Sequence, residues 1–156
     1  MNEDRYLVIN NISKKNNIKD LCITASAYDF CILFSNVEIY NKLNIDYLLK
    51  FGFKYKSFAS LDDIKKFLIE KSVPLIGIEI LDISVPIKSW NFELSEFRVS
   101  FIPGNEGTGL SSKQKAYCDG FVYIPQYGSG TASLNVNIAT SIILNEYNLK
   151  ILNFTT

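Results

Sequence analysis

Two loops in the second half of the chain combine glycines with small polar residues, a composition that lets a backbone approach a ligand closely. The first, Pro103–Gly109, contains three glycines, and glycine adopts positive φ angles without steric cost. The second, Ile124–Val136, places small and polar residues directly before a predicted helix, where free N–H groups and the helix dipole favour an anion. Taken singly, each loop is more often a tight turn or a capped helix start, so neither by itself identifies a site.

The composition excludes several kinds of catalysis. The 156 residues include no histidine, which removes every catalytic scheme with a histidine base and every histidine-ligated metal. Three widely spaced cysteines, of which one must stay unpaired, are typical of a reducing compartment rather than of a disulfide framework or a zinc site. The first loop lacks the Gly-Lys-Ser/Thr of a phosphate-binding loop and the glycine spacing of a dinucleotide fingerprint. We therefore expect no metal.

The overall composition is that of one globular domain spanning 1–156. A hydrophobic content of 47% with 21% charged residues argues against disorder. Lys and Arg number 16, as do Asp and Glu, so no global basic field indicates nucleic-acid binding. No apolar run is long enough to span a membrane, and the first residues lack the form of a signal peptide. We expect an intracellular, cytoplasmic protein without a membrane partner.

The elements that must position the two loops alternate between strands and helices. Strands are expected at Tyr6–Ile9, Phe30–Phe34, Lys54–Phe58, Pro74–Ile80, Phe97–Ile102 and Gly120–Ile124, and helices at Asn17–Tyr28, after Ser60, near Ser112–Cys118 and at Ser133–Tyr147. The β-branched run from Pro74 is typical of a strand covered on both faces. The pattern predicts an α/β fold with a mainly parallel sheet and helices on both faces, in which ligands bind beyond the carboxyl ends of the strands.

Considered together, the two loops indicate a family. The stretch Phe101–Tyr147 resembles the C-terminal half of the SpoU (TrmH-type) RNA methyltransferases of the SPOUT superfamily. Gly104–Gly109 is similar to that family's second motif, and Ile124-Pro125 followed by Ser133–Val136 is similar to its third. The resemblance implies a C-terminal deep trefoil knot, bound S-adenosylmethionine, a homodimer, and methyl transfer to a ribose 2′-hydroxyl of tRNA or rRNA. The chain corresponds to the bare catalytic domain, without the RNA-recruiting extension of many members.

The resemblance also assigns expected roles to individual residues. Expected contacts with the cofactor are Ile102, Gly104, Gly107, Ile124 and Leu134, and the expected active-site positions are Asn17, Glu106, Ser133 and Asn135. A sulfonium methyl group is already a strong electrophile, so such a site has mainly to align it with the attacking oxygen and to assist deprotonation of that oxygen. The absence of histidine is no obstacle to this reaction.

The chain departs from the family at its first motif, which is an Asn, then Gly two residues later and Arg six residues later. Asn17 matches the Asn, but Lys19 stands at the Gly position and Ile23 at the Arg position. Asp29 stands where a later Gly of the same segment is typical. The family's Arg is the residue proposed to activate the ribose hydroxyl, which isoleucine cannot do.

Three interpretations of this departure stay open, and in each of them Ile23 itself is a core residue of its helix. Arg5 or Arg98, the two arginines of the chain, supplies the charge from elsewhere, although Arg98 falls in a strand expected to be buried and Arg5 precedes the first strand, so neither is well placed. Alternatively, a lysine takes the Arg's place without its planar fork; the candidates are Lys14, Lys15 and Lys19. In the third, the chain is a catalytically impaired module that binds cofactor and RNA and acts with a partner.

Two further expectations concern substrate and cofactor. An enzyme with a substrate other than RNA is an alternative that an acidic surface beside Ser133 and Asn135 would favour. A bulky residue in place of Gly104 is expected to block cofactor binding while leaving the fold largely intact.

The C-terminal helix predicts a subunit interface. Apolar residues surround most of Ser133–Tyr147, and Glu146 is its one ionised side chain. A helix packed only on its own sheet normally has a charged outer face. We therefore expect a homodimer whose interface includes Ile138, Ile142 or Tyr147 together with the first helix.

Overall fold

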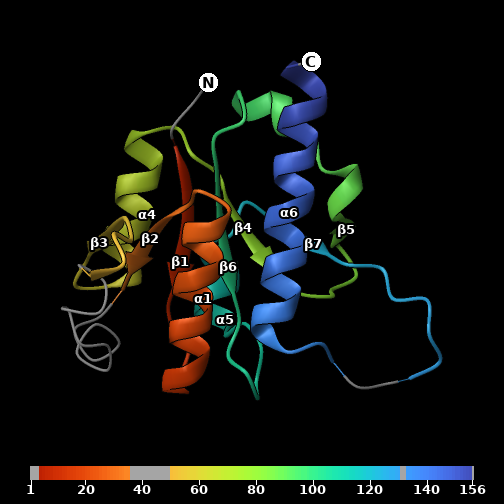
Figure 1. Ribbon diagram of the computed structural model, residues 1–156, viewed down its shortest axis with the longest axis horizontal. Coiled ribbons are helices and arrows are strands. Elements are labelled where there is room, and N and C mark those ends of the chain that lie inside the picture. The colour runs from red at the N-terminus through yellow and green to blue at the C-terminus, as the bar shows by residue number, and fades with distance from the viewer. Residues whose placement is uncertain (1–3, 36–49, 131–132, 156) are drawn as a thin grey trace.

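A sheet of parallel strands forms the centre of the protein (Figure 1). The computed structural model describes residues 4–35, 50–130 and 133–155, and within them seven strands pair in the order β3-β2-β1-β6-β4-β7-β5. These strands are β1 (Arg5–Ile9), β2 (Cys31–Phe34), β3 (Tyr55–Ser57), β4 (Leu75–Ile78), β5 (Val85–Pro86), β6 (Val99–Pro103) and β7 (Gly120–Tyr123). All of their pairings are parallel, which confirms the predicted α/β fold. The trefoil knot stays a prediction.

Helices cover both faces of the sheet. The helical elements are α1 (Lys15–Ala27), α4 (Leu61–Glu70), α5 (Ser112–Tyr117) and α6 (Val136–Thr155), with the short 3₁₀ turns η1 (Ile87–Ser89) and η2 (Phe92–Ser95). Figure 1 shows α1 and α6 side by side in front of the sheet. Side chains alternate along β1, so that Leu7 and Ile9 pack under α1 and α6 whereas Tyr6 and Val8 pack on the opposite face with α4. The result is a three-layer arrangement with two hydrophobic cores.

Several strands begin or end at residues other than those predicted. The strand expected from Phe97 begins at Val99, because Glu96 and Phe97 both have positive φ angles, 53° and 61°, which an extended strand does not accommodate. The run expected as Pro74–Ile80 is a strand only over Leu75–Ile78. The two-residue β5 was not predicted, since a strand of that length has no period to detect. Most of the stretch 35–53, which the pattern did not place, lies outside the described residues.

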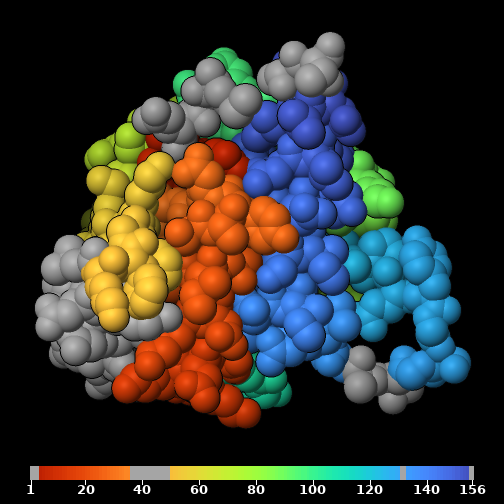
Figure 2. Space-filling model, in the orientation of Figure 1, coloured from red at the N-terminus to blue at the C-terminus, as the bar shows by residue number. Residues whose placement is uncertain are grey.

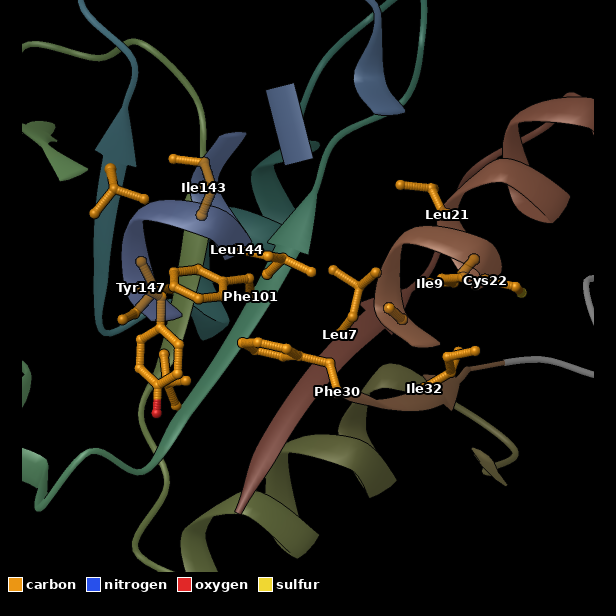
Figure 3. Close-up of a cluster of buried hydrophobic side chains, with 14 of the residues drawn as sticks. Leu7, Ile9, Leu21, Cys22, Phe30, Ile32, Phe101, Ile143, Leu144 and Tyr147 are labelled. Atoms are coloured by element: carbon orange, nitrogen blue, oxygen red, sulfur yellow. The ribbon is translucent and has the colours of Figure 1, made fainter. Parts of the chain in front are cut away.

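Helix α6 is longer than predicted, and the prediction that its Tyr147 lies in a subunit interface is wrong. Tyr147 is fully buried inside its own subunit, where its ring packs edge-on against Phe92 at 4.8 Å between centroids. Its hydroxyl donates a hydrogen bond to the backbone oxygen of Phe97. Figure 3 shows Tyr147 beside Phe30, Phe101 and Leu144 in the core under α1 and α6. This side chain therefore does not face a second subunit.

Candidate functional site

The loop after β6 is closed by its own backbone. The N–H of Asn105 donates to the oxygen of Gly109 at 3.0 Å, and the reverse bond has the same length. The Asn105 side-chain oxygen accepts the N–H groups of Gly107 at 2.9 Å and Thr108 at 3.2 Å. The loop is thus a compact turn at the carboxyl edge of the sheet, the edge where ligands bind in α/β folds.

Two glycines in this loop are required by the space around them. A Cβ at Gly104 would lie 2.4 Å from the carbonyl carbon of Gly109, and no rotamer change relieves a contact with a backbone atom. Gly109 has a φ of +71°, and a Cβ there would lie 2.2 Å from Oε1 of Glu79. The expectation that a bulky residue at Gly104 leaves the fold largely intact is therefore wrong. Gly107, by contrast, is exposed and has room for a Cβ.

Glu106 joins this loop to the start of α1. Its Oε2 accepts the N–H of Lys14 at 2.8 Å and the side-chain amide of Asn17 at 3.1 Å, and its Oε1 accepts the N–H of Ser13 at 3.1 Å. Helix α1 has no side-chain cap of its own and no acidic residue in its first turn, so a carboxylate distant in sequence supplies the negative charge that a helix N-terminus favours. Two predicted active-site residues, Asn17 and Glu106, are thereby brought into contact.

The hydrogen bonds also determine the charge of Glu106. Burial by itself would raise the pKa of this carboxyl group, but hydrogen bonds from its own backbone N–H, from the Asn17 amide and from the N–H groups of Lys14 and Ser13 outweigh it and lower the pKa to about 2. A carboxylate with so low a pKa is a poor proton acceptor near neutral pH. The geometry therefore suits Glu106 to hold Asn17 and the loop in place rather than to remove a proton.

The segment before α6 provides the opposite wall. The side-chain oxygen of Asn135 accepts the N–H of Asn137 at 2.8 Å, and its backbone oxygen accepts the N–H of Ala139 at 3.0 Å, so Asn135 caps the helix. The cap explains why α6 begins at Val136 rather than at Ser133, where the periodicity placed it. Ser133 and Leu134 precede the cap and are exposed.

A cleft of about 590 Å³ lies between these segments, within the size range of small-molecule sites. Eight of the nine predicted site residues line it: Asn17, Gly104, Glu106, Gly107, Ile124, Ser133, Leu134 and Asn135. Ile102 is the exception, because its side chain is fully buried in the core on the α4 face of the sheet. The Ile102 side chain therefore does not face the cleft.

The polar residues that line the cleft without having been predicted as site residues include Glu79 and Thr140, and Lys14 was predicted only as one of several candidate lysines. Glu79, which follows β4, accepts the N–H of Leu110 at 3.1 Å through Oε1, while its Oε2 has no hydrogen bond and lies 3.6 Å from Nζ of Lys115. Thr140 lies one turn inside α6. Lys14, named among several lysines, is the one Lys or Arg side chain on the described cleft lining. Only the position of Glu79 at a strand end was a signal that sequence could provide.

The position of the missing arginine is occupied by a surface residue. Ile23 is 49% exposed on α1 and does not line the cleft, so the interpretation of Ile23 as a core residue is wrong. Arg5 is the buried first residue of β1, where its guanidinium donates to the Tyr28 oxygen at 2.8 Å and lies 4.7 Å from the centre of the Phe30 ring. Arg98 pairs with acidic side chains, including Asp4 at 3.7 Å. Neither arginine lines the cleft, and so neither replaces the missing charge within one chain.

The described residues contain neither a candidate metal cluster nor a candidate membrane-spanning helix. Among residues 4–35, 50–130 and 133–155, no group of three or more His, Cys, Asp or Glu side chains has the proximity to hold a metal ion. In the same part of the chain, none of the helices combines the length and the apolar character needed to cross a bilayer. The three cysteines are unpaired.

Known proteins resemble this chain in sequence pattern and in structure. A family model described as the SpoU rRNA Methylase family matches residues 4–145, whereas a search of curated proteins gave no significant match. The SpoU methyltransferase AviRb from Streptomyces viridochromogenes superposes with a TM-score of 0.80 at 18% identity, over 98% of this chain and 62% of that one. The A. aeolicus TrmH/SpoU tRNA modifying enzyme gives 0.81 at 20% identity, over 99% and 78%.

A third similar structure is the AdoMet-bound rRNA methyltransferase from Sinorhizobium meliloti, with a TM-score of 0.74 at 20% identity over 94% of this chain and 56% of that one. At such identities the likeness establishes a shared fold. The chain spans about three fifths of the length of AviRb and of the S. meliloti structure.

Proposed function

This chain belongs to the SpoU rRNA methylase family, and on that premise we propose that it transfers a methyl group from S-adenosylmethionine to a ribose 2′-hydroxyl of tRNA or rRNA. The observation that supports the proposal most directly is the cleft at the carboxyl edge of the sheet, which residues of both motif loops line. Solved structures of the same fold are described as complexes with AdoMet, AviRb and the S. meliloti enzyme among them. RNA as substrate and an intracellular, cytoplasmic location follow as parts of this proposal.

The residues of the cleft fit such a cofactor. Gly107 leaves open space in which a ligand reaches the loop backbone, and Ile124 and Leu134 provide apolar walls for a nucleoside. When bound, S-adenosylmethionine supplies an electrophilic methyl group, and no metal is needed. Glu106 keeps Asn17 and the first loop in fixed positions, and the exposed Ser133 and Asn135 offer polar groups to a substrate hydroxyl at the rim.

Calorimetry with S-adenosylhomocysteine tests the cofactor, and methyl transfer tests the reaction. We expect binding in the micromolar range, and the absence of binding at millimolar ligand would remove the cofactor from the proposal. Transfer of a radiolabelled methyl group to bulk tRNA or rRNA, followed by nuclease digestion, should place the label on ribose. Label on a base, or no label with either RNA, would contradict the proposed reaction.

The structure favours one alternative, a catalytically impaired module that binds cofactor and RNA beside a partner. Its support is the exposed Ile23 at the arginine position together with the burial or pairing of Arg5 and Arg98 away from the cleft. On the described cleft lining, Lys14 is the one Lys or Arg residue available to an active protein. Tight S-adenosylhomocysteine binding without methyl transfer to any RNA would decide for the alternative.

A substrate other than RNA is not favoured by the charges near the cleft. The carboxylates that line it are Glu79 and Glu106, and protein groups hold both of them: the Leu110 N–H and Lys115 at Glu79, and several donors at Glu106. An acidic surface beside Ser133 and Asn135 would favour such a substrate, but both carboxylates of the described cleft lining are engaged by protein groups.

An apolar stripe on α6 supports the proposed homodimer. Ile138, Ile142, Leu149 and Leu152 recur at helical spacing, and three of them are at least 43% exposed while Ile142 is partly buried. Ile23 of α1 adds a further exposed apolar side chain, and Thr24 beside it donates to the Asn137 oxygen of α6 at 2.6 Å. Figure 2 shows the surfaces of α1 and α6 side by side on one face.

We propose that a second copy of the chain covers this stripe through a symmetric contact. Sedimentation at micromolar concentration should show a species of twice the 17.7 kDa chain mass, and Ile142→Lys should convert it to monomer because a lysine charge would be buried in the contact. Lys50, exposed and distant from the stripe in sequence, provides a control as Lys50→Ala, which should stay dimeric. Wild-type protein that sediments only as the single chain would refute the dimer.

A further inference from the structure

Thr140 has a buried hydroxyl group without a hydrogen-bond partner. The residue is fully buried in the second turn of α6 and lines the cleft, yet its Oγ1 makes no hydrogen bond. A threonine in a helix commonly satisfies its hydroxyl on the carbonyl one turn earlier, and a buried hydroxyl left unpaired destabilises a protein. Nearly all buried polar groups are paired, so one that is not paired at the wall of a cleft points to a partner that binds there.

The next residue on the helix shows the ordinary case. Ser141 donates its hydroxyl to the Asn137 backbone oxygen at 2.8 Å, and its Oγ lies 3.2 Å from Oγ1 of Thr24 on α1. Two consecutive hydroxyls of one helix thus differ: Ser141 is satisfied within the protein, and Thr140 is not. The difference follows from the side of the helix, since Ser141 contacts α1 whereas Thr140 lines the cleft with Val136 and Ala139.

We propose that the Thr140 hydroxyl forms a direct hydrogen bond with the adenosine half of the bound cofactor; this rests on the function proposed above. Thr140 shares its helix face with the apolar Val136 and Ala139, and this apolar part of the cleft suits a flat purine. A purine has ring nitrogens and an exocyclic amine at its rim, which can pair with a single hydroxyl. The charged amino-acid half needs polar partners, and the start of α1 offers one in Asn17, which Glu106 of the first loop holds through a hydrogen bond.

Thr140→Val tests this proposal because valine keeps the shape of threonine and removes the hydroxyl. Calorimetry should show binding weakened roughly five- to tenfold, the loss expected of one neutral hydrogen bond. The loss should be the same for S-adenosylhomocysteine and for 5′-methylthioadenosine, which contains the nucleoside without the amino acid. In the ligand-free protein the thermal midpoint should rise by about 2–4 °C, since the unpaired hydroxyl is gone. Thr140→Ser, which keeps the hydroxyl, should bind both ligands nearly as the wild type does.

Ser141→Ala is the matched control, because it removes a hydroxyl from the same helix that the protein itself satisfies. It should leave the affinity for both ligands unchanged and lower the thermal midpoint. Thr140→Val binding within twofold of wild type would overturn the proposal, as would a lowered midpoint with unchanged affinity. A loss with S-adenosylhomocysteine but not with methylthioadenosine would assign the hydroxyl to the amino-acid half and overturn the adenosine assignment. Wild-type protein that binds neither ligand would overturn the proposed cofactor together with this inference. Wild-type binding that Thr140→Val leaves unchanged would overturn this inference alone, so the two failures are distinguishable.

Discussion

Replacing Glu106 with glutamine should destabilise the protein at neutral pH and leave it nearly unchanged in acid. The wild-type carboxylate accepts the N–H groups of Ser13 and Lys14 and the amide of Asn17, and these bonds lower its pKa from 4.5 to about 2 despite the opposing effect of burial. A tenfold change in acid dissociation corresponds to about 1.4 kcal/mol, which sets an upper limit of about 3 kcal/mol. Solvent reaches this carboxylate, so screening reduces the expected value to about 1–2 kcal/mol.

The sign of the pH dependence follows from the direction of the pKa shift. Because the folded-state pKa of Glu106 is depressed, its contribution is fully present above the ordinary value of 4.5 and is lost as the pH falls toward 2. The difference in unfolding free energy between wild type and Glu106→Gln should therefore be largest at pH 6–7 and close to zero near pH 2. Taking the difference between the two proteins at each pH cancels the titration of the other carboxyl groups.

Urea unfolding followed by circular dichroism at several pH values measures this difference. The matched control is Glu93→Gln, an exposed carboxylate on η2, which should stay within about 0.5 kcal/mol of wild type throughout. A Glu106→Gln effect below about 0.5 kcal/mol at pH 7 would refute the structural role of the carboxylate. An effect of unchanged size at pH 2 would show that the loss does not come from the charge.

Three further outcomes follow from the same geometry. Gly104→Ala should lower the unfolding free energy by at least about 2 kcal/mol because its Cβ would overlap the backbone of Gly109, whereas Gly107→Ala should stay within about 1 kcal/mol of wild type. Equal effects of the two substitutions in thermal unfolding would contradict the steric role of Gly104. Tyr147→Phe should cost about 1–2 kcal/mol in urea unfolding, since the backbone oxygen of Phe97 loses its donor, and a neutral result would be inconsistent with that bond. In an active enzyme, Lys14→Met should lower the rate of methyl transfer at least about tenfold without weakening S-adenosylhomocysteine binding, while substitution of the exposed Lys15 by Met should have no effect. Equal rates for the wild type and both variants would remove Lys14 from the reaction.

Local signals predicted most elements of the fold correctly. Ser60 caps α4 by accepting the N–H of Asp63 at 3.2 Å, and the apolar spacing that follows places Leu61, Ile64 and Leu68 in the core. Errors arose where the backbone changed direction without a glycine or proline, as at Phe97 with its positive φ angle. An intrinsically disfavoured conformation of this kind is imposed by surrounding contacts, and no local pattern indicates it.

The loops of the candidate site were also predictable, but not which side chains would face the cleft. Glycine spacing located Gly104–Gly109, because turn chemistry depends on neighbours in sequence. Ile102 was misplaced since the pleat sends it to the α4 side, a choice that depends on which helices cover each face. Tyr147 was misplaced for a similar reason: periodicity groups it with apolar positions but does not say which neighbour each position meets.

The sequence by itself determined the class of fold, the position of both motif loops along the chain and the absence of histidine chemistry, because periodicity, turn residues and composition are local properties. The tertiary structure alone decided that Glu106 holds the start of α1 across 92 residues of sequence from Lys14, that Ile23 lies at the surface and that both arginines are engaged elsewhere. It alone revealed that Thr140 has an unpaired hydroxyl at the cleft. Hydrogen bonds and burial depend on which distant segments pack together, and that information is absent from any short stretch of residues.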